Sequence, residues 1–280
     1  MEISAELVKR LRSETDAPLM ECKAALQEAN GDFERAKAIL REKGKAAAAK
    51  RSDRSTSAGL VVVALSDDQK QAGAVVLESE TDFVAKNDDF VALAEQLAKA
   101  FLASDPGSDP NAVAVDGKTA GAWVEEAIGK IRENIRIGDA VRFSADSPVS
   151  VYVHHDKTKA ALVGMKGDNP ALQEIGRKIA IQCVAFPPDV IRRADLSQEM
   201  LDREIETETQ RALNEGKPEN IARNIAQGRV NKEYVKRVVL LEQDFYADAS
   251  KTVSTYLAEQ AKEGGSAEVV AFRYLAVGKT

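Results

Sequence analysis

The sequence predicts an α+β fold, and three patterns along the chain predict it. The first 44 residues carry apolar side chains at helical spacing in short stretches. From residue 59 onward, the order β-hairpin then helix occurs twice. Residues 195–237 hold two charge-rich helical stretches with a narrow apolar seam. Antiparallel strands with helices segregated beside them are typical of α+β proteins.

The N-terminal segment predicts a small bundle of three helices. Pro18 stands where a first helical turn tolerates proline, and Asn30-Gly31 ends the helix that follows it. Asp32 can cap a third helix, which we expect to end at Gly44. The core of such a bundle is small, because each helix is short.

A basic segment follows the bundle. Over residues 45–58, lysine and arginine alternate with alanine and then with serine and threonine. A nucleic-acid-binding arm is one interpretation, but a solvated linker fits better because no aromatic residue is interleaved for base stacking. We therefore assign residues 1–52 to a helical docking domain and residues 53–58 to a basic linker.

Residues 59–140 predict the first half of a core. Leu60–Leu65 and Ala74–Glu78 are rich in β-branched residues and flank a polar turn, as expected of a hairpin. Two amphipathic helices should follow, separated by the Pro- and Gly-rich loop 104–111. Their apolar faces are marked by Phe90, Leu93, Ala94, Leu97 and Phe101 in one helix and by Trp123, Ala127, Ile131 and Ile135 in the other.

Residues 141–280 predict the second half. Val149–His155 and Ala160–Lys166 are expected to be strands, and Asn169 can cap the helix after them. A last helix and the strand Val269–Val277 complete this half. The repeated order of hairpin and helix hints at a duplicated architecture, although no repeat is visible in the sequence itself.

An antiparallel helical hairpin is expected within the second half, over residues 195–237. Gly216-Lys217-Pro218 joins its two helices. Its thin seam is marked by Leu201, Ile205 and Ala212 in the first helix and by Ile221 and Ile225 in the second. A narrow seam with charged residues outside it predicts a hairpin that projects from the body.

The composition excludes several classes of function. The net charge is −6, which argues against nucleic acid as the main partner because phosphate binding needs clustered lysine and arginine. The two cysteines, Cys22 and Cys183, make no disulfide framework and fit a reducing compartment. The chain begins without a signal-peptide pattern, and its apolar runs are far shorter than the ~20 residues of a membrane helix. We expect a cytoplasmic protein without a membrane partner.

No catalytic or metal-binding pattern stands out. The only histidines, His154 and His155, are neighbours in a predicted strand, so they should point to opposite faces and not share a metal ion. Neither the P-loop pattern nor G-x-G-x-x-G occurs. Cys183 lies in an apolar stretch and is expected in the core. We predict no catalytic residue, no metal, no cofactor and no nucleotide bound by this chain.

The most informative segment is Thr81-Asp82-Phe83-Val84-Ala85-Lys86-Asn87, at a predicted strand-to-helix corner. The pattern alone favours a structural interpretation, with Phe83 in the core and Asp82 near a helix N-terminus, where a carboxylate is favoured.

This segment resembles the characteristic string of the elongation factor Ts family. Other pieces match that family in the same order over essentially the whole chain: Met20-Glu-Cys-Lys23, Ala25-Leu26, Asn30-Gly-Asp32, Ile131 to Ile137, Tyr152-Val-His154, Gly216-Lys-Pro218, Gly228-Arg229, Leu240 to Phe245 and Ser250-Lys-Thr-Val253. The resemblance implies a ubiquitin-associated-like N-terminal bundle, a core of two α+β halves and a coiled-coil hairpin inserted in the second half.

The resemblance also implies a function. Proteins of this family bind elongation factor Tu carrying GDP and accelerate GDP release, without themselves making or breaking bonds. It maps Asp82 and Phe83, with Thr81 and Val84 beside them, onto the segment that disturbs the Mg²⁺ site of the GTPase. The other contacts that it implies with elongation factor Tu are made by Lys23, Ile137, Gly138 and His154.

Two departures from the family pattern are visible. Arg132 stands where the family usually has glycine, which bears on the local contacts over residues 131–138. The ending Gly-Lys-Thr suggests that a C-terminal module carried by some members is missing.

Two other classes of function remain alternatives. One is an adaptor that binds a protein ligand through the N-terminal bundle and has no exchange activity. The other, more remote, is an enzyme that uses Cys183 or His154.

Overall fold

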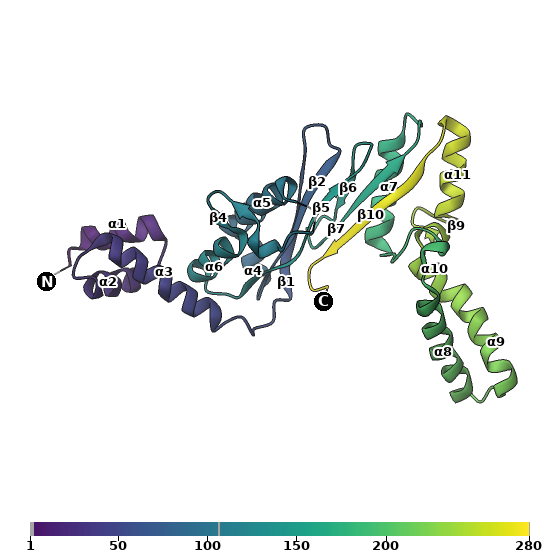
Figure 1. The fold of residues 1–280 in the computed structure, drawn as a ribbon, viewed down its shortest axis with the longest axis horizontal. Coiled ribbons are helices and arrows are strands. Elements are labelled where there is room, and N and C mark those ends of the chain that lie inside the picture. The colour runs from purple at the N-terminus through teal and green to yellow at the C-terminus, as the bar shows by residue number, and fades with distance from the viewer. Residues whose placement is uncertain (1–2, 106, 280) are drawn as a thin grey trace.

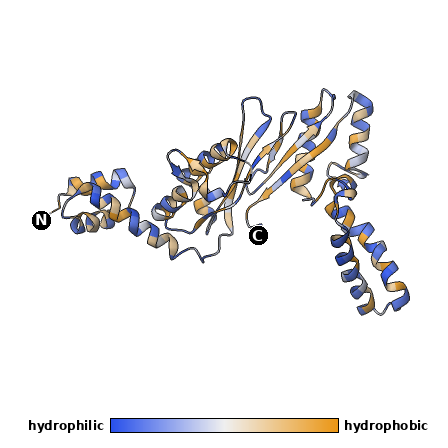
Figure 2. Cartoon of the chain, viewed as in Figure 1, coloured by the Kyte–Doolittle hydropathy of each residue, from blue (hydrophilic) through white to orange (hydrophobic). Residues whose placement is uncertain are grey.

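The computed structural model describes residues 3–105 and 107–279. The described chain is elongated, with a helical bundle at the N-terminal end, a body of sheets and helices, and a projecting pair of helices at the other end (Figure 1). Apolar residues follow the strands of the body, whereas hydrophilic residues dominate the projecting helices (Figure 2). The strands pair antiparallel and the helices lie in separate layers, so the predicted α+β class is confirmed.

The N-terminal bundle consists of α1 (Ala5–Thr15), α2 (Leu19–Glu28) and α3 (Phe33–Ala49). The Asp32 carboxylate accepts the Arg35 N–H at 3.0 Å, so the predicted cap of α3 is confirmed. The buried side chains of this bundle are small or aliphatic: Val8, Leu11, Cys22, Ala25, Leu26, Ala29, Ala36 and Leu40.

Helix α3 continues beyond Gly44, so the predicted end at that glycine is wrong. Gly44 lies against Gly129 of helix α6 (Ala120–Ile131), and a Cβ built on Gly44 would stand 3.9 Å from the Gly129 Cα. Beyond the crossing, Ala48 is buried in the core of the first half. Glycine inside a helix costs about 1 kcal/mol relative to alanine. Here the missing side chains let two helices approach closely, and the packing beyond the crossing offsets that cost.

The first half is built on the antiparallel sheet β1-β2-β5. Strands β1 (Ala58–Leu65) and β2 (Gln71–Ser79) form the predicted hairpin. Strand β5 (Ile135–Ser144) pairs with β2 and was not predicted. Its first residue, Ile135, was expected in the last turn of α6 but begins the strand instead, because α6 ends at Ile131 and its C-cap residue, Arg132, has a left-handed φ of 71°. Helix α5 (Asp88–Ala103) and α6 pack on one face of this sheet.

The second half repeats this plan with the sheet β10-β7-β6. Its strands are β6 (Ser150–Val153), β7 (Lys159–Lys166) and β10 (Glu268–Ala276), and its helices are α7 (Leu172–Ala185) and α11 (Val253–Gly264). The helix-free faces of the two sheets meet in a shared core. It contains Val61, Ala72, Ala74, Val76 and Phe143 from one half and Val149, Ala160, Leu162 and Leu275 from the other. The central strands are therefore buried on both faces, which explains their continuous apolar runs.

The duplication hinted at by the sequence extends to short elements. Each half has a 3-10 turn and a small hairpin before its second helix. These elements are η1 (Pro110–Ala112), β3 (Ala114–Val115) and β4 (Lys118–Thr119) in one half, and η4 (Leu240–Glu242), β8 (Asp244–Phe245) and β9 (Asp248–Thr252) in the other.

A lysine-threonine pair occupies the same place in both halves. Thr119 caps α6 and Thr252 caps α11, and each hydroxyl accepts the backbone N–H three residues later at 3.2 Å. The preceding lysine reaches a glutamate eight residues on: Lys118 to Glu126 at 2.6 Å, and Lys251 to Glu259 at 2.7 Å. The sequence thus carries a short repeat whose spacing becomes visible only in the fold.

The projecting hairpin consists of α8 (Gln198–Asn214) and α9 (Glu219–Arg229). It is flanked by η2 (Arg193–Asp195), the π-helical turn η3 (Val230–Tyr234) and α10 (Val235–Val238). The predicted seam is wrong in part, because Ile221 is exposed and the buried residues facing α8 are Ala222 and Ala226. A separate apolar cluster at the base of the hairpin contains Leu196, Val230, Val235, Val238 and Val239.

We expect the outer part of the hairpin to be dispensable for folding. Replacing residues 207–227 by a short Gly-Ser link leaves the base cluster intact and removes mainly the alanine seam. Urea unfolding should stay cooperative, and the free energy of unfolding should fall by less than about 2 kcal/mol. A wider cut over residues 197–231 also removes Val230 from the base cluster and should cost more. A molten or insoluble product from the shorter cut would place the hairpin in the main core.

Candidate functional site

A short helix at the end of β2 carries the segment singled out from the sequence. Two residues separate the end of this strand from helix α4 (Asp82–Ala85). We call Thr81, Asp82, Phe83 and Val84 the α4 site. Val84 is buried in the core of the first half. Its neighbour Phe83 is 81% exposed, the largest exposure of any big apolar side chain among the described residues. The structural interpretation that placed Phe83 in the core is therefore wrong.

The acidic residue of the α4 site is also exposed. Asp82 forms an ion pair with Lys86, one turn further on, at 2.7 Å. The hydrogen bond from the Lys86 ammonium holds the pKa of the Asp82 carboxyl below its usual value, so this carboxylate is charged at neutral pH. The α4 site thus presents a charged group and an aromatic ring to the solvent side by side.

Thr81 donates hydrogen bonds to both carboxylate oxygens of Glu133. The Thr81 N–H donates to Glu133 Oε2 at 2.9 Å, and its hydroxyl donates to Oε1 at 2.7 Å. The Thr81 carbonyl accepts the Ser79 hydroxyl at 2.9 Å. Thr81 therefore makes its polar contacts inside the molecule, whereas the side chains of Asp82 and Phe83 are exposed to solvent.

Ile137 and Gly138 lie in β5, where the pairing with β2 contains a bulge. Ile137 is half-buried against the first core, and Gly138 is exposed. A Cβ on Gly138 would stand 2.6 Å from the carboxyl carbon of Glu78. Packing alone therefore explains a glycine at this position, because any side chain would collide with the Glu78 carboxylate.

That carboxylate belongs to a side chain that is 1% exposed. Glu78 Oε2 lies 2.6 Å from Arg136 Nε and accepts the Thr56 hydroxyl at 3.2 Å. Its Oε1 accepts the N–H of Gly278, near the C-terminal end, at 2.8 Å. One buried acid thus joins the linker, β2, β5 and the segment after β10.

His154 lies in the turn after β6, not within the strand as predicted. Its ring centroid is 4.3 Å from that of His155, and the Tyr152 hydroxyl lies 3.1 Å from its Nδ1. The expectation that the two histidines point to opposite faces of a strand is therefore wrong. The turn rests on the first half, because the Lys157 carbonyl accepts the Val61 N–H of β1 at 2.7 Å. Helix α4 also contacts β1, so both places border the same strand.

Lys23 is remote from these residues. It is exposed on α2, within the N-terminal bundle at the far end of the molecule (Figure 1). Leu19 and Met20 are also exposed on the same end of α2. This apolar pair was not predicted, although its spacing of three and four residues from Lys23 places it on the same face of a helix.

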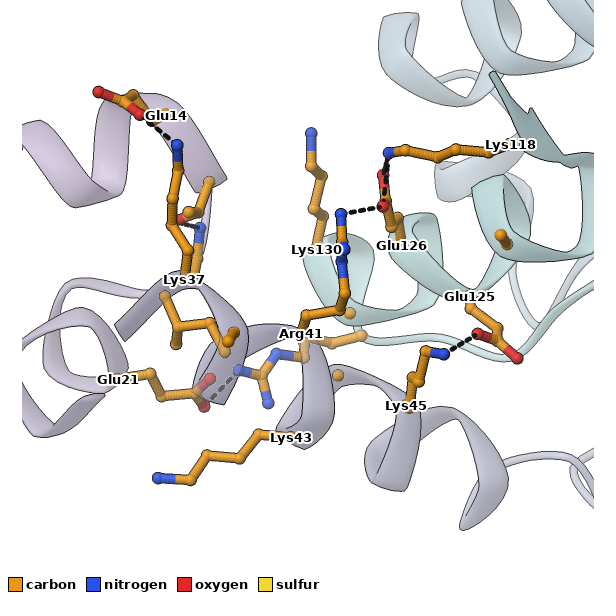
Figure 3. Close-up of a pocket in the computed structure, with 18 of the residues that line it drawn as sticks. Glu14, Glu21, Lys37, Arg41, Lys43, Lys45, Lys118, Glu125, Glu126 and Lys130 are labelled. Atoms are coloured by element: carbon orange, nitrogen blue, oxygen red, sulfur yellow. Dashed lines mark hydrogen bonds and ion pairs between the residues drawn. The ribbon is translucent and has the colours of Figure 1, made fainter. Parts of the chain in front are cut away.

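A charged cavity lies between the bundle and α6 (Figure 3). Its volume is about 640 Å³. Arg132 bonds to Glu21 of α2, and Lys130 lies 3.0 Å from Asp16. Further ion pairs around it join Lys37 to Glu14, Arg41 to Glu126 and Lys45 to Glu125. Ion pairs this exposed contribute at most about 1 kcal/mol each, so they stabilise the contact between the bundle and α6 only weakly.

Cys183 is fully buried as predicted, and burial raises the pKa of its thiol to about 12, which makes it unreactive. Within the described part of the chain, no three His, Cys, Asp or Glu side chains are grouped so that they could hold a metal ion. No helix there is long and apolar enough to cross a membrane.

Comparison with known proteins agrees with the resemblance seen in the sequence. The family model described as "Elongation factor TS" matches residues 80–279, which include the α4 site. A relative from Clostridium botulinum is 41% identical over 273 residues, covering 95% of this chain and 89% of its own. One from Chloroherpeton thalassium is 40% identical and covers 93% of each chain, and one from Aquifex aeolicus is 37% identical and covers 92% of this chain and 93% of its own. Each of these relatives is called elongation factor Ts, and this chain belongs to the elongation factor Ts family.

Proposed function

We propose that this elongation factor acts as a nucleotide-exchange factor on elongation factor Tu. It binds the GDP-bound form, disturbs the Mg²⁺ site of that GTPase and promotes GDP release during translation elongation. The observation that carries this proposal is the exposed ring of Phe83 on the short helix α4. The next residue of that helix, Val84, is buried in the core. An apolar side chain held out in this way gains free energy when a partner buries it, about 1.5–3 kcal/mol for a phenylalanine.

The α4 site supplies the disturbance. Phe83 enters between helices of the GTPase domain and shifts the groups around its Mg²⁺. Small shifts suffice, because Mg²⁺ demands near-ideal octahedral oxygen geometry. Once the ion is lost, the diphosphate of GDP loses its main counter-charge and dissociates. The chain therefore acts by binding and makes or breaks no covalent bond.

The exchange follows from linkage. A protein that binds nucleotide-free elongation factor Tu more tightly than the GDP form must weaken GDP binding by the same factor. Each tenfold of mutual weakening corresponds to about 1.4 kcal/mol of interface free energy. This chain needs no nucleotide site of its own for that task.

The other partner contacts follow the same proposal. His154 presses on the GTPase from the second half, and Ile137 and Gly138 contact it beside β2. Lys23 contacts it from the N-terminal bundle, together with the exposed Leu19 and Met20. We propose that residues 1–52 form the docking domain, residues 53–58 its linker, and residues 59–140 and 141–280 the two core halves.

A second candidate function rests on that apolar pair on α2. An adaptor would hold a protein ligand through the bundle and leave nucleotide binding unchanged. The affinity of this chain for elongation factor Tu, measured with and without excess GDP, separates the two functions. Strong antagonism by GDP supports exchange, and equal affinities support the adaptor.

The direct test is fluorescent GDP release from elongation factor Tu. The release rate should rise with the concentration of this chain and saturate. A release rate that stays at the spontaneous value, while the two proteins are shown to bind, contradicts the proposal.

A further inference from the structure

Three consecutive residues after α6 each hold a different segment of the chain. Arg132 bonds to Glu21 of the N-terminal bundle. Glu133 holds Thr81 of the α4 site through both of its carboxylate oxygens. Asn134 donates its N–H to Glu80 at 2.6 Å and its amide to a linker carbonyl at 2.7 Å. The central member of this series touches the α4 site, and its neighbours fix it on either side.

Thr81 occupies the position where a threonine normally caps a helix. A capping hydroxyl accepts a backbone N–H from the first turn of the helix. The Thr81 hydroxyl instead donates to Glu133, 52 residues away in sequence. The orientation of α4 is therefore set by a residue outside it.

Helix α4 is too short to order itself. It contains four residues, and a single helical turn is unfavourable in isolation because its nucleation fixes several dihedral angles for one hydrogen bond. Phe83 adds no core packing, because its ring is exposed. Val84 anchors the helix on one side, and the Glu133 carboxylate anchors its start. Hydrogen bonds to an ionised carboxylate are about twice as strong as neutral ones.

We propose that Glu133 is a positioning residue for exchange: it orders the α4 site in the free protein, so that Phe83 meets the partner already oriented. This inference rests on the proposed exchange function. A segment ordered before binding loses less conformational entropy when it binds. If the backbone of one residue of the α4 site must be fixed during binding instead of beforehand, the insertion step should slow about tenfold.

The residues on both sides of Glu133 fix its position. Arg132, before it, ends α6 in the left-handed conformation and turns the chain toward α4. Asn134, after it, is fixed by Glu80, and Arg54 lies 3.4 Å from the same Glu80 carboxylate. The contacts of Arg132 and Asn134 therefore fix the backbone at Glu133 and help to direct its carboxylate toward Thr81.

The test compares variants at both ends of the contact in the full chain. Glu133→Ala removes the carboxylate. Thr81→Val removes the hydroxyl and suits the extended backbone of Thr81, with φ −125° and ψ 156°. Thr81→Ser keeps both hydrogen bonds and serves as the rescue variant. Glu95→Ala removes an exposed carboxylate from α5, in the same half, and serves as the matched control.

Fluorescent GDP release from elongation factor Tu, measured over a range of concentrations of each variant, gives a maximal rate and a half-saturating concentration. Glu133→Ala should lower the maximal rate about tenfold and change the half-saturating concentration less than about twofold, since the bundle and the second half still bind. Thr81→Val should act in the same direction, and the double variant should be no slower than Glu133→Ala, because the two residues share one contact. Thr81→Ser should lose less of the maximal rate than Thr81→Val, and Glu95→Ala should behave as the wild type.

Amide hydrogen exchange tests the positioning without the partner. The amides of Thr81 and of Ala85, which donates to the Thr81 carbonyl at 3.4 Å, should exchange at least about tenfold faster in Glu133→Ala, while the thermal midpoint stays within about 3 °C of the wild type. Unchanged exchange at these amides, or a double variant whose losses multiply, overturns the proposal. If Glu133→Ala unfolds, Thr81→Val decides, and an unchanged maximal rate in that variant overturns it. A wild type that fails to stimulate release defeats the exchange function instead, while the amide measurement still tests Glu133.

Discussion

Phe83→Ala is expected to separate stability from activity more sharply than any other substitution in this chain. The free energy of unfolding should stay within about 1 kcal/mol of the wild type, because the ring is 81% exposed. Stimulated GDP release should slow about 10- to 100-fold, because the partner no longer buries a side chain worth about 1.5–3 kcal/mol. Urea unfolding and fluorescent GDP release on the same samples measure both.

Neighbouring variants serve as controls for this result. Phe83→Leu keeps most of the apolar volume and should retain most of the activity. Val84→Ala, which truncates a buried residue, should lower the free energy of unfolding by about 1–3 kcal/mol. Asp82→Ala should slow release less than Phe83→Ala does, and the two effects need not add. A stable Phe83→Ala variant with undiminished release would remove Phe83 from the mechanism, and a loss of about 3–5 kcal/mol in stability would show that the ring is buried.

Arg136→Ala is expected to have the largest effect on stability. It leaves the Glu78 carboxylate, which is 1% exposed, with the Thr56 hydroxyl and one backbone N–H as its remaining partners. A buried carboxylate that loses the charge compensating it costs about 3–5 kcal/mol, because it stays desolvated. Urea unfolding at neutral pH measures the loss. Arg136→Lys keeps the charge and should recover part of it.

Arg273→Ala is the matched control. Arg273 pairs with Asp139 at 2.8 Å, and its side chain is 46% exposed, against 48% for Arg136. The two pairs differ in the acid, because Asp139 is 29% exposed and Glu78 is buried. Arg273→Ala should therefore cost less than about 1 kcal/mol. Equal losses in the two variants would mean that burial of the acid does not set the cost.

Local patterns predicted most of the fold because the elements that they describe are determined locally. The hairpins follow from β-branched runs around polar turns, and the Asp32 cap follows from one residue type at one position. Strand β5 could not be predicted in this way. It is an edge strand with charged residues at Arg136, Asp139 and Arg142, and its bulge breaks the alternation that reveals a strand.

The α4 site shows where a sequence pattern stops being informative. A phenylalanine beside an acid at a strand-to-helix corner fits a buried ring as well as an exposed one. The two cases differ in which neighbour faces the core, and the structure gives that place to Val84. Glu133 was missed because its partner Thr81 is distant in sequence, and no local periodicity connects the two.

The equivalence of the two halves gives the molecule an unused site for engineering. Between α5 and η1, the first half has residues 104–109, whereas the second half holds residues 186–239, with the whole projecting hairpin, between α7 and η4. The same arrangement of helix, 3-10 turn and small hairpin therefore accepts either a short connection or a long insertion at this position. Surface connections of this kind accept inserted sequence readily. Residues 107–109 of this connection therefore offer a grafting point for a dye-binding peptide or a small folded tag, in the half that carries Phe83 and away from the base of the hairpin.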